Sequence, residues 1–211
     1  CRDLLAESYL DSWSRFEADP CHFCFRQRGN GRVYWGAVNQ PKSLRRSNIR
    51  FIYGGKEVRG VEVDLSSSFF VFVAVESGCD ALALAVGEDR VYETLADNCP
   101  QAFSNRDSLK VGAQVQCLFG AENFGRQPLF GAMYSIWPDA AKWVRETRRQ
   151  HGVSGLSRML MESEAAFMWD KLVPLLVKSR IPALPIHDGV IVPEPAAEIV
   201  QTLATVLIRK H

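Results

Sequence analysis

Two short stretches rich in β-branched residues predict strands that each end on an aspartate. The first covers residues 58–64 and ends at Asp64, where a serine stretch begins. The second covers residues 181–193 and is interrupted by His187-Asp188-Gly189. An Asp-Gly step between apolar runs favours a tight β-hairpin, because both residues tolerate positive φ. The pattern therefore predicts a hairpin with Asp188 at its tip.

Apolar residues at helical spacing predict helices over most of the remaining chain. The serines at 66–68 suit the start of a helix over residues 69–76, which Ser77-Gly78 ends. Other helices are predicted over residues 2–17, 90–96, 106–119, 138–150, 156–177 and 195–210, with a short helix after Pro41 and a short strand over residues 32–38. The last helix places Ile199, Leu203, Val206 and Leu207 on one face. This order predicts an α+β fold in which a small antiparallel sheet is backed by helices.

The composition is that of a soluble globular protein. The chain has 211 residues, of which 47% are hydrophobic and 23% charged, enough for one large domain. No apolar run approaches the roughly 18 residues of a membrane span, so we expect no membrane partner. The six cysteines are scattered, which favours reduced thiols and a cytoplasmic location. Cys21 and Cys24 form a lone CxxC, which is either incidental or part of a metal site completed by His22 or another segment.

Positive charge is concentrated in one stretch, although the formal net charge is only +1. Residues 26–56 contain no Asp or Glu, and aromatic residues alternate with the basic ones. This pattern suits phosphate contacts combined with base stacking, and a solvated basic face is the alternative. The candidate nucleic-acid-binding residues in this stretch are Lys42, Arg45, Arg46 and Arg50.

The two strand-end aspartates are the candidate catalytic and metal-binding residues. Asp64 and Asp188 lie far apart in sequence, but both stand where a strand meets a polar loop. If they converge, they form a carboxylate pair of the kind that holds divalent ions for phosphoryl transfer. The carbonyl of Leu65 is a further candidate ligand. Glu62 is expected to point to the opposite strand face and is interpreted as a structural or surface residue.

Three short motifs follow one another along the chain. The first is residues 62–68, an aspartate at a strand end followed by serines. The second is Arg106 and Lys110, one helical turn apart, with Phe119-Gly120 further on, and the third is residues 186–188. In this order they resemble motifs A, B and C in the palm and partial fingers of the DNA polymerase I-like superfamily, which includes the single-subunit phage RNA polymerases. Residues 89–96 are similar to the short helix between motifs A and B.

The resemblance implies a polymerase-type palm with reduced fingers over residues 26–211, after an N-terminal helix and lead-in over residues 1–25. It implies a template-directed nucleotidyltransferase, DNA polymerase-like or RNA polymerase-like, that uses Mg²⁺ or Mn²⁺. Its partners would be a nucleic-acid primer–template and nucleoside triphosphates. The implied nucleotide-binding residues are Arg106, Lys110, Gln114 and Phe69, with His187 at a primer phosphate. Arg106 and Lys110 share one helical face, for which a solvated basic stripe is the alternative.

Several positions depart from the family pattern. Phe119 stands near the family's tyrosine, Met161 replaces a glutamine, and Gly189 stands where many members carry a second acid. Glu164 is either a partner of the site or a buried polar group on a helix. The resemblance covers neither a thumb nor an exonuclease domain. Two other functions therefore stay open: a non-catalytic nucleic-acid-binding module with a polymerase-derived fold, and a two-metal nuclease.

Overall fold

The computed structural model describes residues 26–27, 33–34, 49–65, 67–99, 103–120, 124–186 and 188–210. The helices predicted over residues 2–17 and after Pro41 lie outside these residues. So do the CxxC pair, and the candidate site residues Lys42, Arg45, Arg46 and His187.

A four-stranded antiparallel sheet forms the base of the site, in the order β3-β4-β6-β5. Its strands are β3 (Arg50–Tyr53), β4 (Lys56–Asp64), β5 (Leu184–Ile186) and β6 (Gly189–Pro193). Gly54 and Gly55 join β3 to β4 with φ of 60° and 76°, a conformation that glycine adopts readily. A separate pair joins β1 (Arg26–Gln27) to β2 (Val33–Tyr34). The predicted strand over residues 58–64 and the C-terminal hairpin are confirmed.

The hairpin places Asp188 as predicted. Ile186 pairs with Gly189, so Asp188 lies in the turn between β5 and β6. Gly189 does not have a positive φ. The tolerance of glycine for positive φ, on which the prediction relied, is therefore not used at Gly189.

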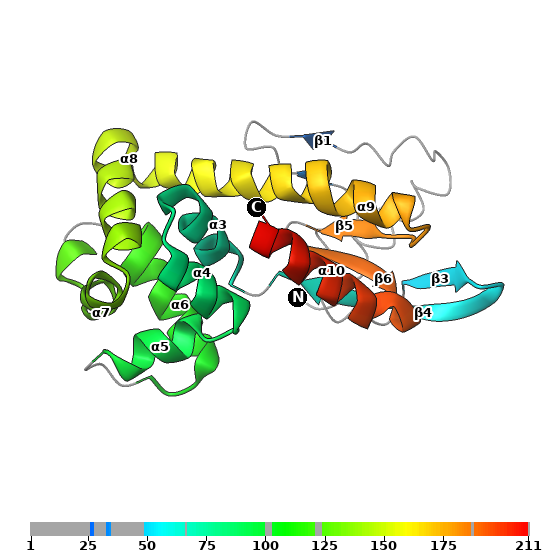
Figure 1. Cartoon of the computed structure of the whole chain (residues 1–211), viewed down its shortest axis with the longest axis horizontal. Coiled ribbons are helices and arrows are strands. Elements are labelled where there is room, and N and C mark those ends of the chain that lie inside the picture. Colours follow the sequence, from blue (N-terminus) through cyan, green and yellow to red (C-terminus); the bar gives the residue numbers. More distant parts are fainter. Residues whose placement is uncertain are drawn as a thin grey trace, which may run out of the picture.

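The two faces of the sheet have different surroundings. One face carries Val63, Val190 and Val192, which belong to the main core. The helix α10 (Ala197–Lys210) covers β4 and β6, crossing the sheet as Figure 1 shows. A smaller apolar cluster combines buried Ile186 and Ile191 with Ile49, Phe51 and Leu184.

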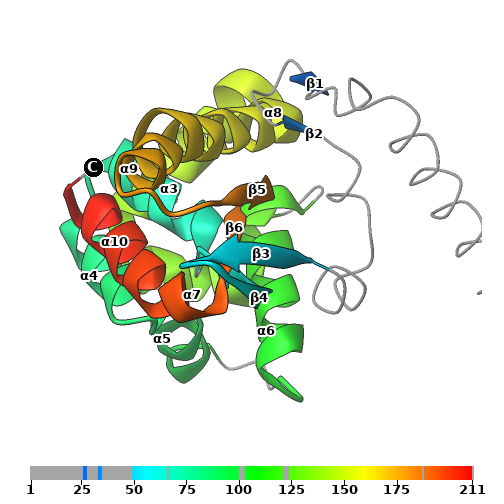
Figure 2. The same cartoon turned by 90° about the vertical axis from the view of Figure 1, so that its right-hand side faces the viewer.

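Helices make up most of the rest of the described chain. They are α3 (Ser68–Ser77), α4 (Asp80–Gly87), α5 (Val91–Asp97), α6 (Arg106–Ala113), α7 (Pro128–Ile136), α8 (Pro138–Ala166) and α9 (Val173–Lys178). Helices α3 to α7 lie at one end of the sheet, whereas α8 runs from that end along the sheet to α9, which lies beside β5 (Figures 1 and 2). Short π- or 3₁₀-helical segments adjoin them: η2 (Gln114–Phe119), η3 (Phe124–Arg126), η4 (Phe167–Leu172) and η5 (Glu194–Ala196). The fold is α+β, as predicted. All the helices expected within the described residues are present, and α4 and α7 are additional.

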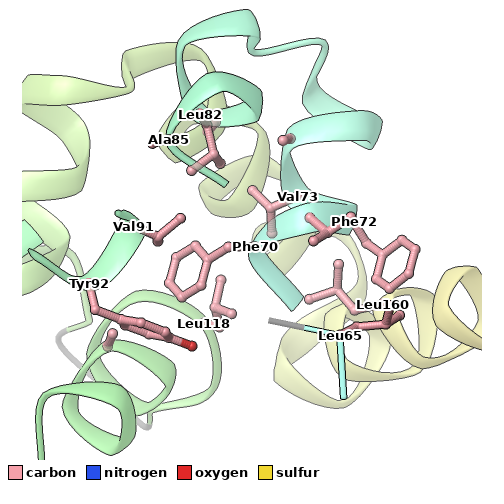
Figure 3. Packing of buried hydrophobic residues seen from close by; sticks show 14 of the residues in the cluster. Leu65, Phe70, Phe72, Val73, Leu82, Ala85, Val91, Tyr92, Leu118 and Leu160 are labelled. Carbon is pink, nitrogen blue, oxygen red and sulfur yellow. The ribbon is translucent and has the colours of Figure 1, made fainter. Parts of the chain in front are cut away.

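Helix α3 is the centre of the core. Its Phe70, Phe72 and Val73 are completely buried, and Figure 3 shows Phe70 packed near Val91 and Leu118 from two other helices. An apolar helix without a polar face is stable only when other elements surround it, as they do here. Gly78 ends α3 in the left-handed conformation that commonly closes helices, with φ of 63°.

Three expectations about the helices are corrected in detail. Ser67 occupies the position before α3, but its side chain makes no capping hydrogen bond. Helix α8 is interrupted at Gly152, where φ is 69°, so the two predicted helices run together across a break. The predicted face of the last helix is partly wrong, because Ile199 and Val206 are 56% and 41% exposed, whereas Val200 and Ala204 are buried.

Across the described segments, we find no helix that combines the length and apolarity needed to cross a membrane.

Candidate functional site

The sheet brings the two candidate aspartates to one edge. Asp64 is the last residue of β4 and pairs with Gly189, which directly follows Asp188. The backbone N–H of Leu65 donates a hydrogen bond to the carbonyl of Asp188 at 2.9 Å. Asp64 is exposed and Asp188 half-buried. The predicted adjacent antiparallel strands are therefore present, with Asp64 at the end of β4 and Asp188 in the turn just before β6. A shared metal pair stays a prediction.

Glu62 lies on the same face as Asp64, so the expectation that it points to the opposite face is wrong. Both residues belong to the continuous strand β4, and their register with β6 is regular. Side chains two positions apart along a strand point to the same face. Glu62 is half-buried, and one of its carboxylate oxygens is inaccessible to solvent. A third acidic residue thus faces the side of the sheet that carries Asp64.

The donor set at this edge suits a hard divalent cation. Carboxylate and carbonyl oxygens on rigid strands are ligands that Mg²⁺ and Mn²⁺ prefer. Asp64, Asp188 and the backbone at Leu65 supply oxygens of this kind. In the described segments of the chain, no group of three or more His, Cys, Asp or Glu residues is placed to hold a metal ion. The arrangement therefore fits ions that take their remaining ligands from phosphates and water.

The predicted nucleotide-binding residue Arg106 is held by two carboxylates. It starts α6, lies 3.1 Å from an oxygen of Asp89 and 2.9 Å from one of Glu93, and is 45% exposed. The hydrogen bond with Asp89 is the main cause that raises the pKa of the guanidinium. Asn105 and Ser108 form a capping box that fixes the start of the helix. Arg106 thus ties α6 to the turn before α5 and to α5 itself.

Tyr92 is a buried residue of α5 that contacts Lys110 of α6. The Lys110 ammonium lies 5.9 Å from the centroid of the Tyr92 ring. Tyr92 is 3% exposed, and burial raises the pKa of its phenol, while a side-chain interaction with Ser67 lowers it. No pattern in the sequence indicates this contact, because a tyrosine on a short helix is usually only a core residue. Gln114, which was predicted to bind nucleotide together with Arg106 and Lys110, is half-buried at the start of η2.

The two phenylalanines singled out by motif position are in contact. The rings of Phe69 and Phe119 meet edge to face, with their centroids 5.0 Å apart. Aromatic pairs prefer this geometry. Phe119 also borders a hollow of about 350 Å³ that Met161 helps to line. Segments far apart in the sequence, α3 and η2, are therefore joined beside the strand end that carries Asp64.

The remaining features surround the site rather than belong to it. Glu164 is completely buried in α8. A cavity of about 670 Å³ lies between α3, α4 and α10, and among the candidate site residues that the structure describes only Leu65 lines it. Arg50 is exposed on β3, with its Nε 3.9 Å from an oxygen of Glu57.

Arg148 caps the end of η2, which continues the helix that carries Arg106 and Lys110. This residue was not identified from the sequence. From α8 it donates hydrogen bonds to the carbonyls of Leu118, at 3.0 Å, and Gly120. These carbonyls lack helical partners because the helix ends there. Burial lowers the pKa of this guanidinium. No local pattern identifies such a partner, because it lies about thirty residues away along the chain.

We expect Arg148→Met to lower the free energy of unfolding by about 2 kcal/mol, because it leaves two backbone carbonyls without a charged donor. Urea denaturation of the full chain measures this loss. Arg149→Met, at an exposed neighbouring position, is the control and should change stability by less than about 0.5 kcal/mol. Equal effects of the two substitutions would contradict a specific role for Arg148.

No protein-family model matches this chain, and no curated protein matches it.

Proposed function

We propose that this chain is a template-directed nucleotidyltransferase whose sheet and surrounding helices form a polymerase-type palm. The observation that carries the proposal is the pairing of β4 with β6, which places Asp64, the last residue of β4, opposite Gly189, the residue that follows Asp188. A second observation supports it: Phe69, just after motif A, and Phe119, at the end of motif B, touch each other.

The protein's part in this chemistry is to supply rigid oxygen ligands. Asp64 is fixed by the β4–β6 ladder, and the backbone of Asp188 is fixed by the hydrogen bond from Leu65. Rigid placement matters because the reacting groups must be aligned before the reaction. Two divalent ions, when bound, would activate the attacking hydroxyl and neutralise charge on the phosphates. Leu65, buried next to Asp64, anchors this edge in the core.

The basic face of α6 would bind the incoming triphosphate. Arg106 offers bidentate contacts to phosphate and Lys110 a single positive charge. In the present structure Arg106 is paired with Asp89 and Glu93, so it must exchange carboxylate partners for phosphate when nucleotide binds. Phe69 would lie near the sugar and Gln114 near the base or template.

Arg106→Ala should raise the KM for nucleotide about thirtyfold, because a charge-assisted contact contributes about 2 kcal/mol. Asp89→Asn is the matched variant, since it removes one of the two ion pairs of Arg106 but keeps the arginine. It should leave KM unchanged or lower it. Steady-state kinetics at varied nucleotide concentration separate the two. If both variants raise KM equally, Arg106 acts only by tying α6 to its neighbours.

The basic stretch would contact the phosphates of the primer–template. Changing Arg45, Arg46 and Arg50 together to Ala should weaken nucleic-acid binding and flatten its salt dependence. Each lost phosphate contact lowers the slope of log K against log salt by about 0.9 on duplex DNA. Fluorescence anisotropy at several salt concentrations measures this slope. An unchanged slope in the triple variant would mean that these arginines form only a solvated surface.

Primer extension tests the proposed function. The full chain is incubated with a primed template, nucleoside triphosphates and Mg²⁺ or Mn²⁺. Template-dependent extension supports the proposal, and shortening of the primer instead indicates a two-metal nuclease. One observation favours another candidate, a nucleic-acid-binding module without catalysis. Arg106, the residue proposed to bind the triphosphate, is instead engaged in ion pairs that join α6 to its neighbours. Tight binding of primed template with neither extension nor cleavage would identify that module.

A further inference from the structure

The junction between β4 and β6 leaves no room for a side chain at Gly189. A Cβ atom built there would lie 2.7 Å from the carbonyl oxygen of Val63 and 2.9 Å from Oδ1 of Asp64. It would also lie 3.1 Å from Cα of Asp64. Carbon atoms in proteins keep about 3.5–4 Å from their non-bonded carbon neighbours. Any other residue at this position would therefore have to displace the carboxylate of Asp64 or the strand beneath it.

Glycine is needed here for space and not for backbone conformation. Gly54, Gly55, Gly78 and Gly152 have positive φ, and Gly189 does not. A residue with a side chain can therefore adopt the backbone of Gly189. What it cannot do is occupy the volume in which the Asp64 carboxylate lies.

We propose that Gly189 is a positioning residue for the metal-binding pair. Because Gly189 has no side chain, the carboxylate of Asp64 can lie against the first residue of β6, directly beside Asp188. This inference rests on the proposed function and extends it, since it assigns a role to a residue that supplies no ligand. Space at Gly189 therefore matters more to metal affinity than the number of carboxylates at this edge.

Gly189→Ala and Gly189→Asp separate space from charge. Both add a Cβ atom, but only Gly189→Asp adds a negative charge that attracts cations. If Asp64 must lie over Gly189, both variants should bind Mn²⁺ at least about tenfold more weakly, the size of effect seen when residues that orient metal ligands are changed. Mn²⁺ alone is titrated into the full 211-residue chain and the free ion is measured by electron paramagnetic resonance. Tighter binding by Gly189→Asp would overturn the proposal.

Two other glycines provide matched controls. Gly131 on α7 has nothing within 4 Å of the position of its Cβ, so Gly131→Ala should leave Mn²⁺ affinity unchanged. A Cβ at Gly60 on β4 would meet side-chain atoms of Ile49 and Ile191 at 2.9 and 3.0 Å. Gly60→Ala therefore strains the same sheet without touching Asp64, and it should lower Mn²⁺ affinity far less than Gly189→Ala. Equal losses in the two strand variants would overturn the proposal.

A stability cycle without metal tests the contact itself. Gly189→Ala should destabilise the protein less in an Asp64→Ala background, because the contact with Oδ1 is then gone. Thermal unfolding of the four proteins gives this coupling. If Gly189→Ala alone fails to fold, Asp64→Ala should restore folding. Additive effects, or no restoration, would mean that the backbone of Val63 alone excludes a side chain, and would overturn the proposal.

The two readouts also distinguish this inference from the proposed function. If the wild-type chain binds no Mn²⁺, or if Asp188→Asn binds it as well as the wild type, the metal site of the proposed function fails. The stability cycle then still decides whether Gly189 positions Asp64. If Asp188→Asn loses Mn²⁺ binding and Gly189→Ala retains it, the proposed function stands and the inference fails.

Discussion

Replacing Asp64 or Asp188 with Asn should slow nucleotide addition about 10³-fold, equivalent to about 4 kcal/mol of transition-state stabilisation. Asn keeps the size of the side chain but loses the negative charge that a hard cation requires. The sheet should be unaffected, because the β4–β6 ladder and the hydrogen bond from Leu65 are made by the backbone. Single-turnover primer extension in saturating Mg²⁺ measures the rate, and circular dichroism checks the fold.

The two substitutions should also be far from additive. If both aspartates hold the same ions, the double variant loses little more than either single variant. Asp97→Asn is the control, because Asp97 is exposed at the end of α5 and should tolerate the change. Activity within about threefold of wild type in either single variant would exclude a shared carboxylate site, since losing a ligand cannot be that mild.

The sheet edge was predictable because its signals are local. A β-branched run ending in Asp64 and an Asp-Gly step between apolar runs each specify a strand end without help from the rest of the fold. Even so, two details were wrong. Glu62 shares the face of Asp64, as the period of two along β4 requires. Gly189 serves close approach to Asp64 rather than a positive φ.

The surroundings of the site depended on contacts between distant segments. Tyr92 contacts Lys110, and Arg148 contacts the carbonyl of Leu118, and both partners are too distant along the chain for a local sequence pattern to reveal them. The ion pairs of Arg106 with Asp89 and Glu93 likewise appear only once α5 and α6 are packed together. Helices α4 and α7 are short and apolar, and their sequences lack the polar face by which periodicity identifies a helix. In the last helix, the residues buried by packing are Val200 and Ala204 rather than Ile199 and Val206.

Phe69→Ala should reduce the preference for deoxynucleotides over ribonucleotides about a hundredfold. Phe69 is the second residue of α3, and its ring contacts that of Phe119 with the two centroids 5.0 Å apart, so its position is well defined. A fixed aromatic ring beside the sugar would exclude a 2′-hydroxyl by size, and a methyl group would admit it. The ratio of kcat/KM for dNTP and rNTP incorporation measures this preference.

The competing explanation is that Phe69 only packs against the core, where it is half-buried. Phe69→Leu distinguishes the two, because it keeps most of the apolar volume but loses the flat ring. A size-based gate predicts an intermediate preference for Phe69→Leu and a strong loss for Phe69→Ala, with both variants folded. A core role predicts that urea stability falls in Phe69→Ala while the preference stays the same. A wild-type preference for ribonucleotides would exclude the gate, because the ring would then be in place without excluding the hydroxyl.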